Sequence, residues 1–161
     1  MMRLLYRVLL VVGVGTATPA AQADGMPVRE LVLHAERAEM ELGFGWSRGE
    51  SSHRWVSRAE ADLWFDLSAA GDMTFSLQAG VPYLHWRRQR IGLYVNGRWV
   101  AEWVAADDPE FHVYTVAVPA AYFVEGRNRL TLRMAYRTHI GRDHRLLALS
   151  VRSVILEEAA R

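Results

Sequence analysis

The strongest constraint on the fold of this chain is a strict alternation of side-chain character in short runs. In "ADLWFDL", residues 61–67, alanine, leucine and phenylalanine occupy every second position, and two aspartates stand between them. Successive side chains of a β-strand point to opposite faces of a sheet, so this period predicts a half-buried strand. Comparable alternating or short apolar runs occupy residues 30–34, 73–79, 91–95, 98–105, 112–118, 130–136 and 146–156, whereas 35–43 fits either a helix or a strand.

Turn signals separate these runs. Asn96-Gly97 is the strongest of them, because both residues accept the positive φ of a type I′ hairpin turn. Residues 71–72 and 125–128 mark further turns, and Pro119 ends a run because it cannot donate a hydrogen bond to a sheet. The spacing predicts an all-β chain, namely an antiparallel β-sandwich or jelly roll of eight or nine strands.

The first 23 residues have the pattern of a secretory signal peptide. Arg3 and Arg7 precede a short apolar stretch, and Ala21 and Ala23 stand at the two positions that a signal peptidase reads. The apolar stretch is shorter than the ~20 residues of a membrane span, so we expect no stable span after cleavage. We predict a signal peptide at 1–23, one domain at 24–161, and a periplasmic or secreted protein. An uncleaved anchor is the alternative.

The composition argues against several classes of protein. The chain contains no cysteine, which excludes disulfides, thiol catalysis and cysteine-ligated metal sites. The formal net charge of +1 gives no reason to expect a nucleic-acid partner. All 19 basic residues are arginine. A guanidinium suits carboxylate and phosphate recognition, although a composition bias of the source genome is the favoured explanation.

Catalytic and metal motifs are missing from the sequence. There is no G-x-S-x-G elbow and no phosphate-binding glycine loop, and the chain is short for a glycoside hydrolase, so we predict that it is not an enzyme. The six histidines lack the spacing of metal motifs, although His139 and His144 would lie near each other. We expect no cofactor and no metal. Asp107 and Asp108 suit a structural Ca²⁺ ion, but a solvated turn is favoured there.

Several short motifs follow one another in an order that resembles the galactose-binding-domain-like β-sandwich family. They are "W-S-x-x-E" at 46–50, "R-W" at 54–55, the strand at 61–67, "V-N-G" at 95–97, "Y-T-V-A-V-P" at 114–119, "G-x-N-x-L-T-L" at 126–132 and "D-x-R-x-L-x-L" at 143–149. The resemblance implies a jelly roll of the kind found in carbohydrate-binding modules and in accessory domains of exported glycan-processing proteins.

One subgroup resembles the chain more closely. It is the β-sandwich appended to bacterial membrane glycosyltransferases and polysaccharide-assembly proteins, whose last strand follows an Asp-x-Arg-x-Leu-Gly motif. Asp143, Arg145 and Leu147 match this motif, whereas the usual glycine is absent. The close backbone approach that such a glycine permits is therefore not implied here.

The segment "YLHWRRQR", residues 83–90, is the main candidate for ligand binding. It lies between two predicted strands and shows no alternation, so we expect a loop, where binding groups concentrate. Aromatic rings stack on sugar rings, and guanidinium groups bind uronate, sulfate or phosphate in a bidentate manner. The predicted glycan site consists of Tyr83, His85, Trp86, Arg87, Arg88 and Arg90. An equally weighted alternative is a loop that closes one end of the sandwich with Trp86 as its plug.

A second set of residues permits two interpretations. Trp46, Glu50, Arg54 and Trp55 suit a sugar platform, in which charged groups orient the sugar hydroxyls. The favoured interpretation is structural: the two tryptophans close one end of the sandwich, and Glu50 pairs with Arg142 or Arg145.

Three tryptophans fall on predicted strands. Trp99 and Trp103 are expected on the same face of one strand, and Trp64 lies on another. Packing in the core is favoured over an exposed aromatic strip, because the interior of a sandwich needs large side chains.

Two functional hypotheses follow from these observations. The first is an exported, non-catalytic carbohydrate-binding module that acts on envelope glycan or exopolysaccharide. The alternative is a structural or assembly subunit that binds another envelope protein through its sandwich surface. A concave groove around Tyr83 and Trp86 would favour the glycan, and a flat apolar patch would favour the protein partner.

Replacing Trp86 by Ala tests the main candidate site. If the indole ring stacks on a sugar, the variant is expected to lose glycan binding while its melting temperature stays nearly unchanged. Binding assays and thermal denaturation measure the two properties side by side. A Trp86→Ala protein that fails to fold would show that Trp86 is a core plug.

Overall fold

The part of the chain that is described contains eleven antiparallel strands and one short 3-10 helix, joined by turns and loops. The computed structural model describes residues 28–32, 40–50, 52–82, 87–106, 108 and 110–159. The strands are β1 (Val28–Val32), β2 (Glu41–Leu42), β3 (Trp46–Gly49), β4 (Arg54–Val56), β5 (Glu60–Leu67), β6 (Met73–Gly80), β7 (Arg90–Val95), β8 (Arg98–Val104), β9 (His112–Val118), β10 (Gly126–Met134) and β11 (Leu149–Glu158), and the 3-10 helix is η1 (Ala120–Tyr122). Among these residues no helix has the length and apolar character that crossing a membrane requires. The predicted signal peptide lies outside them.

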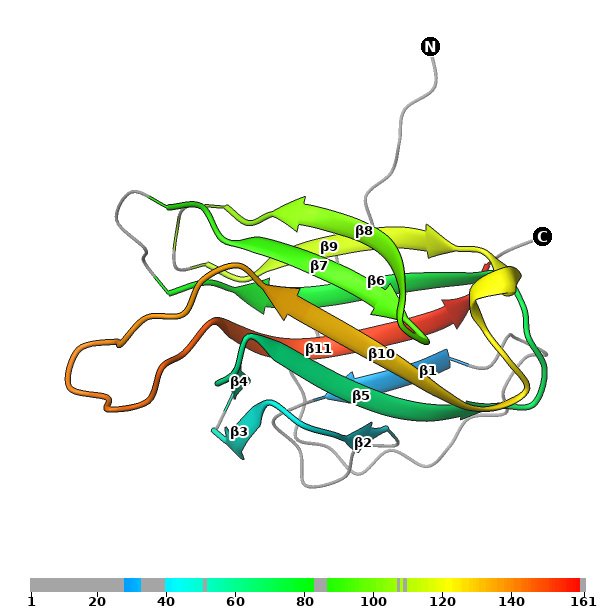
Figure 1. Ribbon diagram of the computed structural model, residues 1–161, viewed down its shortest axis with the longest axis horizontal. Helices are drawn as coiled ribbons and strands as arrows, with labels where there is room; N and C mark the ends of the chain where they lie inside the picture. The colour runs from blue at the N-terminus through cyan, green and yellow to red at the C-terminus, as the bar shows by residue number, and fades with distance from the viewer. Residues whose placement is uncertain are drawn as a thin grey trace, which may run out of the picture.

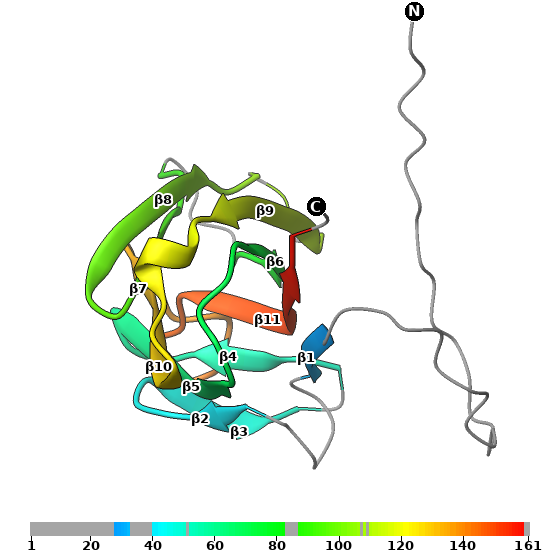
Figure 2. The same ribbon diagram turned by 90° about the vertical axis from the view of Figure 1, so that its right-hand side faces the viewer.

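The strands form two sheets that pack face to face (Figures 1 and 2). One sheet has the order β3-β4-β11-β6-β9, with β1 also paired to β11, and the other has the order β2-β5-β10-β7-β8. Every pairing is antiparallel, as predicted. Eight strands have five or more residues, in line with the predicted eight or nine. The other three, β2, β3 and β4, are too short to show an alternating pattern.

The core lies between the two sheets and follows the predicted alternation. In β5, Leu63 and Phe65 are buried against the opposite sheet, and Asp62 and Asp66 face outward. The facing strand β6 buries Phe75 in the same way. Burying one leucine or phenylalanine side chain stabilises a fold by about 1.5–3 kcal/mol. Because the chain has no cysteine, this burial replaces cross-links as the main source of stability.

A bulge in β8 corrects the prediction for the tryptophans. Leu93 of β7 faces Ala101, but its neighbour Tyr94 faces Trp99, so the register shifts by one residue between them. Trp103 therefore points into the sandwich, where its ring stacks on Phe75 with centroids 6.0 Å apart. Trp99 lies on the outside, 58% exposed. The expectation that both tryptophans share one face is wrong, because one extra residue reverses the side-chain direction.

The predicted hairpin at Asn96-Gly97 is confirmed. Asn96 has a φ of 50° and Gly97 a φ of 79°, as a type I′ turn requires. The Asn96 side chain also fastens the turn to β10 and to the segment before it: its Nδ2 donates to Asn128 Oδ1 at 2.8 Å and to the Tyr122 carbonyl at 3.0 Å. Asn128 is fully buried and itself bonds Val124. The turn residue thus has a second role that its sequence signal does not reveal.

Gly45 marks the corner where the chain passes from one sheet to the other. Strand β2 pairs with β5, whereas β3 pairs with β4 in the opposite sheet. Gly45 has a φ of +97°, and a Cβ atom there would lie 2.0 Å from the Glu60 carbonyl oxygen. Only glycine fits this crossing, since any side chain would collide with the backbone of β5.

Substitution of Gly45 by Ala is expected to destabilise the protein severely. The positive φ alone costs an alanine about 1–2 kcal/mol, and the collision with the Glu60 carbonyl adds enough to bring the loss to roughly 3 kcal/mol or more. The matched control is Gly97→Ala, where φ is also positive but a Cβ atom meets nothing within 4 Å. Urea denaturation of both variants measures the difference. Equal losses of unfolding free energy would contradict the close packing at Gly45.

Candidate functional site

A pocket of about 510 Å³ opens at one end of the sandwich. Three segments that are far apart in sequence surround it: β3, the turn between β4 and β5, and the loop at 135–148 between β10 and β11 (Figure 1). Its lining consists of Ser47, Arg48, Ser57, Arg58, Arg137, His139, His144, Arg145 and Leu146. The volume lies within the range of roughly 300–1,000 Å³ that is typical of small-ligand sites.

The lining of this pocket is strongly basic. It contains four arginines and two histidines, and no aspartate or glutamate is among the nine residues. A concave surface with charges of one sign concentrates the electrostatic field. Guanidinium and imidazole N–H groups are hydrogen-bond donors, so the pocket is suited to a ligand that presents acceptors.

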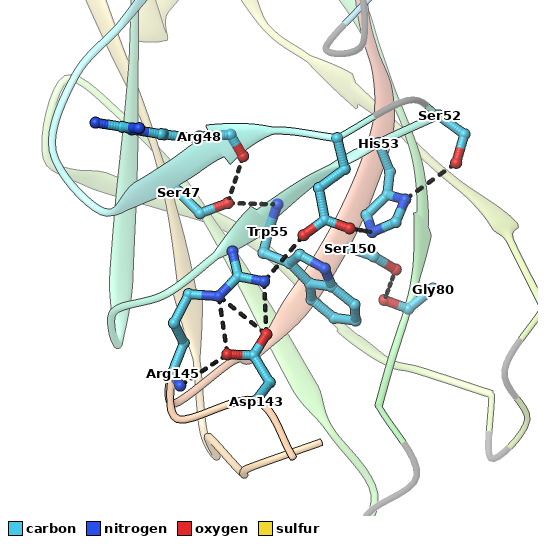
Figure 3. A network of polar contacts seen from close by, with 10 residues as sticks. Ser47, Arg48, Ser52, His53, Trp55, Gly80, Asp143, Arg145 and Ser150 are labelled. Carbon is cyan, nitrogen blue, oxygen red and sulfur yellow. Dashed lines mark hydrogen bonds and ion pairs between the residues drawn. The ribbon is translucent and has the colours of Figure 1, made fainter. Parts of the chain in front are cut away.

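Arg145 joins the pocket loop to β3. Its Nη2 donates to Glu50 Oε1 at 3.0 Å, and its Nε lies 3.0 Å from both carboxylate oxygens of Asp143. Figure 3 shows the guanidinium between the two carboxylates. Hydrogen bonds from Arg145 lower the pKa of Asp143 from 3.8 to about 2. The same contacts, first of all the one to Asp143, raise the pKa of Arg145.

Glu50 extends this network towards an aromatic cluster. Its Oε2 lies 3.5 Å from His53 Nε2, a separation at the limit of a hydrogen bond, so the contact is weak. The His53 ring meets Trp55 edge to face at 5.1 Å, and it lies 6.0 Å from Phe111. The Arg152 guanidinium lies 4.0 Å from the centre of the Phe111 ring. Glu50 therefore connects the pocket loop to the packing around Trp55.

Hydrogen bonds to neighbouring strands position β3. Trp46 packs against the core, and its Nε1 donates to the Asp62 carbonyl at 2.7 Å. Arg54 Nη1 donates to the Ser47 carbonyl at 3.0 Å. The pairing of β3 with β4 is irregular between Trp46 and Gly49. The Arg48 side chain in this stretch is exposed, and Figure 3 shows it pointing away from Asp143.

Gln89 holds both ends of the pocket loop. Its side chain is 1% exposed, and its Nε2 donates to the Tyr136 carbonyl at 2.8 Å and to the Ala148 carbonyl at 3.0 Å. Its Oε1 accepts a hydrogen bond from the Tyr136 backbone at 3.0 Å. An isolated bridge between Thr138 and Leu147 closes the neck of the loop. The loop is thus fastened at its base, and Arg145 fastens its far part.

The glycan site predicted at 83–90 lies only partly in the described residues. Tyr83, His85 and Trp86 lie outside them. Arg87 and Arg88 are exposed, with the Arg87 guanidinium 5.1 Å from the centre of the Tyr136 ring. Arg90 begins β7 and pairs with Glu102 at 2.8 Å. None of the three arginines lines the pocket, and the role of this segment in binding stays a prediction.

The structural interpretation of the second residue set has support. Trp46 packs on the core, and the expected pairing of Glu50 with Arg145 is confirmed. Trp55 and Arg54 are half-buried beside them. Arg142, the other predicted ion-pair partner of Glu50, is exposed and forms no ion pair with it. Of the predicted site residues that the structure describes, Arg145 is the one that lines the pocket.

Most of the pocket residues escape sequence reasoning. Arg48, Arg58 and Arg137 resemble ordinary surface arginines in the sequence, because nothing there shows that the three come together. A signal did exist in "RTHIGRDHR", residues 137–145, where three arginines and two histidines crowd into nine positions. The expectation that His139 and His144 lie near each other agrees with their common place in the pocket lining.

A second hollow, on the outer face of the β2-β5-β10-β7-β8 sheet, is much smaller. It measures about 60 Å³, and it carries both signs of charge, with Glu60 and Asp62 beside Arg129 and Arg133. The nearby Trp64 ring is covered by the Arg127 and Arg129 guanidinium groups, and Tyr94 by Arg133. These aromatic faces are already occupied, which leaves the basic pocket as the better candidate.

Nothing in the described residues gathers three metal-ligating side chains of the His, Asp or Glu type. Asp108, half of the Ca²⁺ candidate, accepts hydrogen bonds from the His112 ring at 2.7 Å and from the Glu110 backbone at 2.9 Å. These bonds, that of His112 foremost, lower the pKa of Asp108. Asp107 lies outside the described residues.

Comparisons with known proteins bear on the fold. No family model matches the sequence, and a sequence search finds no match among curated proteins. In structure, the CBM36-1 domain of a multidomain xylanase from the hindgut metagenome of Trinervitermes trinervoides aligns with a TM-score of 0.51, at 11% identity, over 84% of this chain and 100% of that chain. A family GH115 4-O-methyl-α-glucuronidase with specificity for decorated arabinogalactans aligns with a TM-score of 0.53, at 10% identity, over 91% of this chain.

The chain has the galactose-binding-like jelly-roll fold. This confirms the fold that the resemblance of short motifs implies. The aligned region spans only 19% of the length of the glucuronidase. A ruminal GH26 endo-β-1,4-mannanase aligns with 74% of this chain, at a TM-score of 0.47 and 11% identity, and the aligned region spans 21% of the mannanase. The CBM36-1 domain, in contrast, is matched over its whole length. The likeness at this level is one of fold.

A carboxyl ¹³C NMR titration tests the electrostatics of the jelly roll's pocket loop. Asp143 is expected to titrate at about 2, and Arg145→Gln is expected to bring its pKa most of the way back to 3.8. Because folding lowers the pKa of Asp143, its pairing with Arg145 stabilises the loop fully above pH 3.8. This stabilisation is lost as the pH falls through about 2. Arg142→Gln, in the same loop, is the control and should leave the value unchanged. An Asp143 pKa near 3.8 in the unaltered protein would contradict the pairing.

Proposed function

We propose that this protein is an exported, non-catalytic carbohydrate-binding module that acts on envelope glycan or exopolysaccharide. The observation that carries the proposal is the jelly-roll fold, because all of the CBM36-1 domain of a xylanase aligns with 84% of this chain. A pocket of about 510 Å³, rich in hydrogen-bond donors, offers such a ligand a place on the described surface. Export rests on the signal-peptide pattern in residues 1–23.

The chemistry of the pocket supports binding without catalysis. Glycoside hydrolysis uses a pair of carboxyl groups, and no carboxylate is among the lining residues. The two lining serines donate to backbone carbonyls: Ser47 Oγ to Arg48 at 2.9 Å and Ser57 Oγ to Gly45 at 3.3 Å. Neither hydroxyl forms a hydrogen bond with a histidine of the described residues that would activate it as a nucleophile.

A second candidate function has an observation of its own. Strands β8 and β9 are edge strands of the two sheets and lie side by side (Figures 1 and 2). They carry three exposed apolar side chains, Trp99, Val104 and Val113. Exposed apolar residues on unpaired edges are typical of protein interfaces. This surface supports the alternative of an assembly subunit that binds another envelope protein.

A glycan-array screen of the mature protein, residues 24–161, with and without Ca²⁺, tests the two functions against each other. Reproducible binding to one class of polysaccharide is expected if the protein is a carbohydrate-binding module. The Trp99→Ser variant is the control for the alternative, since it alters the apolar edge surface without touching the pocket, and it should bind the same glycans. A blank array from well-folded protein, together with capture of an envelope protein that Trp99→Ser abolishes, would favour the assembly subunit.

A further inference from the structure

Three arginines of the basic pocket have no acidic partner among the described residues. The ion pairs found there engage Arg90, Arg127, Arg133 and Arg145. No carboxylate of the described part lies within 4.0 Å of a guanidinium nitrogen of Arg48, Arg58 or Arg137. The pocket therefore collects positive charge that the surrounding protein does not neutralise.

Gathering like charges around a concave surface is unfavourable unless something offsets it. The guanidinium groups repel one another, and the cavity strengthens the local field compared with a flat surface. An anion in the pocket would relieve this repulsion. Arginine is suited to such a ligand, because its planar fork of N–H groups matches a carboxylate, sulfate or phosphate in a bidentate manner.

Arg145 has a different role from the other three. Its guanidinium is already bonded to Asp143 and Glu50, so few of its donors remain for a ligand. It joins the loop that carries Arg137 and the two histidines to the end of β3, the strand that carries Arg48. It is a positioning residue, and Gln89 supports it by fixing both ends of the loop.

The size of the pocket and its remaining lining fit more than a bare ion. A water molecule occupies about 30 Å³ of liquid volume, and a simple oxyanion is only a few times larger, so it would fill a small part of about 510 Å³. The exposed apolar side chain of Leu146 and the imidazole N–H groups of His139 and His144 also line the cavity. A sugar ring has both an apolar C–H face and hydroxyl acceptors, and it would use both kinds of group.

We propose that this pocket binds an acidic saccharide, with Arg48, Arg58 and Arg137 holding the carboxylate, sulfate or phosphate substituent of its sugar ring. The saccharide part of this inference rests on the proposed function, whereas the anion part rests on the pocket alone. None of the described residues of the segment at 83–90 lines the pocket.

The first test compares matched ligands by isothermal titration calorimetry. Neutral, uronate and sulfated forms of the same tetrasaccharide, in the β-1,4-glucan and the β-1,4-mannan series, are titrated into the protein purified after export. An acidic form is expected to bind at least about tenfold more tightly than its neutral parent, and to weaken as salt rises from about 50 mM to about 500 mM. Preference for the uronate form indicates that the pocket selects a carboxylate group, and preference for the sulfated form indicates that it selects a sulfate group.

Variants of the pocket arginines assign the effect to this site. Arg58→Gln and Arg137→Gln are each expected to weaken acidic binding about tenfold while leaving the melting temperature nearly unchanged. Arg142→Gln removes one arginine from the same loop without altering the pocket lining, and should change the affinity less than about twofold.

A second measurement separates failure of the inference from failure of the proposed function. Sodium sulfate alone is expected to shift the His139 and His144 ring signals in NMR spectra of the unaltered protein, and not in Arg58→Gln/Arg137→Gln. Equal binding of neutral and acidic saccharides, unaffected by the pocket variants, would overturn the inference and leave the proposed function intact. A sulfate response without binding of any saccharide would overturn the proposed function and reduce the site to an anion site. No sulfate response and no acidic preference would overturn the inference altogether.

Discussion

Burial of two apolar sheet faces against each other is the interaction on which the rest of this structure depends. No disulfide reinforces the fold, since the chain has no cysteine. The alternating leucine, valine and phenylalanine side chains of the inner strands therefore supply most of the stability, and Phe75 stacks on Trp103 between the sheets. A rigid sandwich of this kind leaves its ends and connecting loops free to carry function.

The pocket exists because a few polar side chains hold irregular segments against that sandwich. Gln89 bonds both ends of the loop at 135–148, and Arg145 links its far part to Glu50. Trp46 fastens β3 to the opposite sheet through the Asp62 carbonyl. These contacts are not themselves suited to ligand binding. They bring together arginines from three distant parts of the chain, and the resulting cluster of charge is the most distinctive chemical feature of the described surface.

Sequence reasoning was most successful where local chemistry decides the structure. The hairpin at Asn96-Gly97 follows from the tolerance of both residues for positive φ, and the strand at 61–67 follows from its alternation. It failed at the bulge in β8, because one extra residue reverses the direction of Trp99 and leaves no mark on the pattern. The pairing of Glu50 with Arg145 was accessible because the fold that the motifs resemble places the two segments side by side.

The sequence by itself determined the all-β class, the antiparallel sandwich and the reliance on burial, since alternation, turn residues and the lack of cysteine are local or compositional properties. Only the tertiary structure decided which charged residues meet. Arg48, Arg58 and Arg137 are separated by up to 89 positions, which follows from their numbers, 137 − 48, and they surround one cavity. Such proximity depends on how the two sheets and their end loops pack in space. An exposed arginine has the same local signature whether it borders a pocket or faces open solvent.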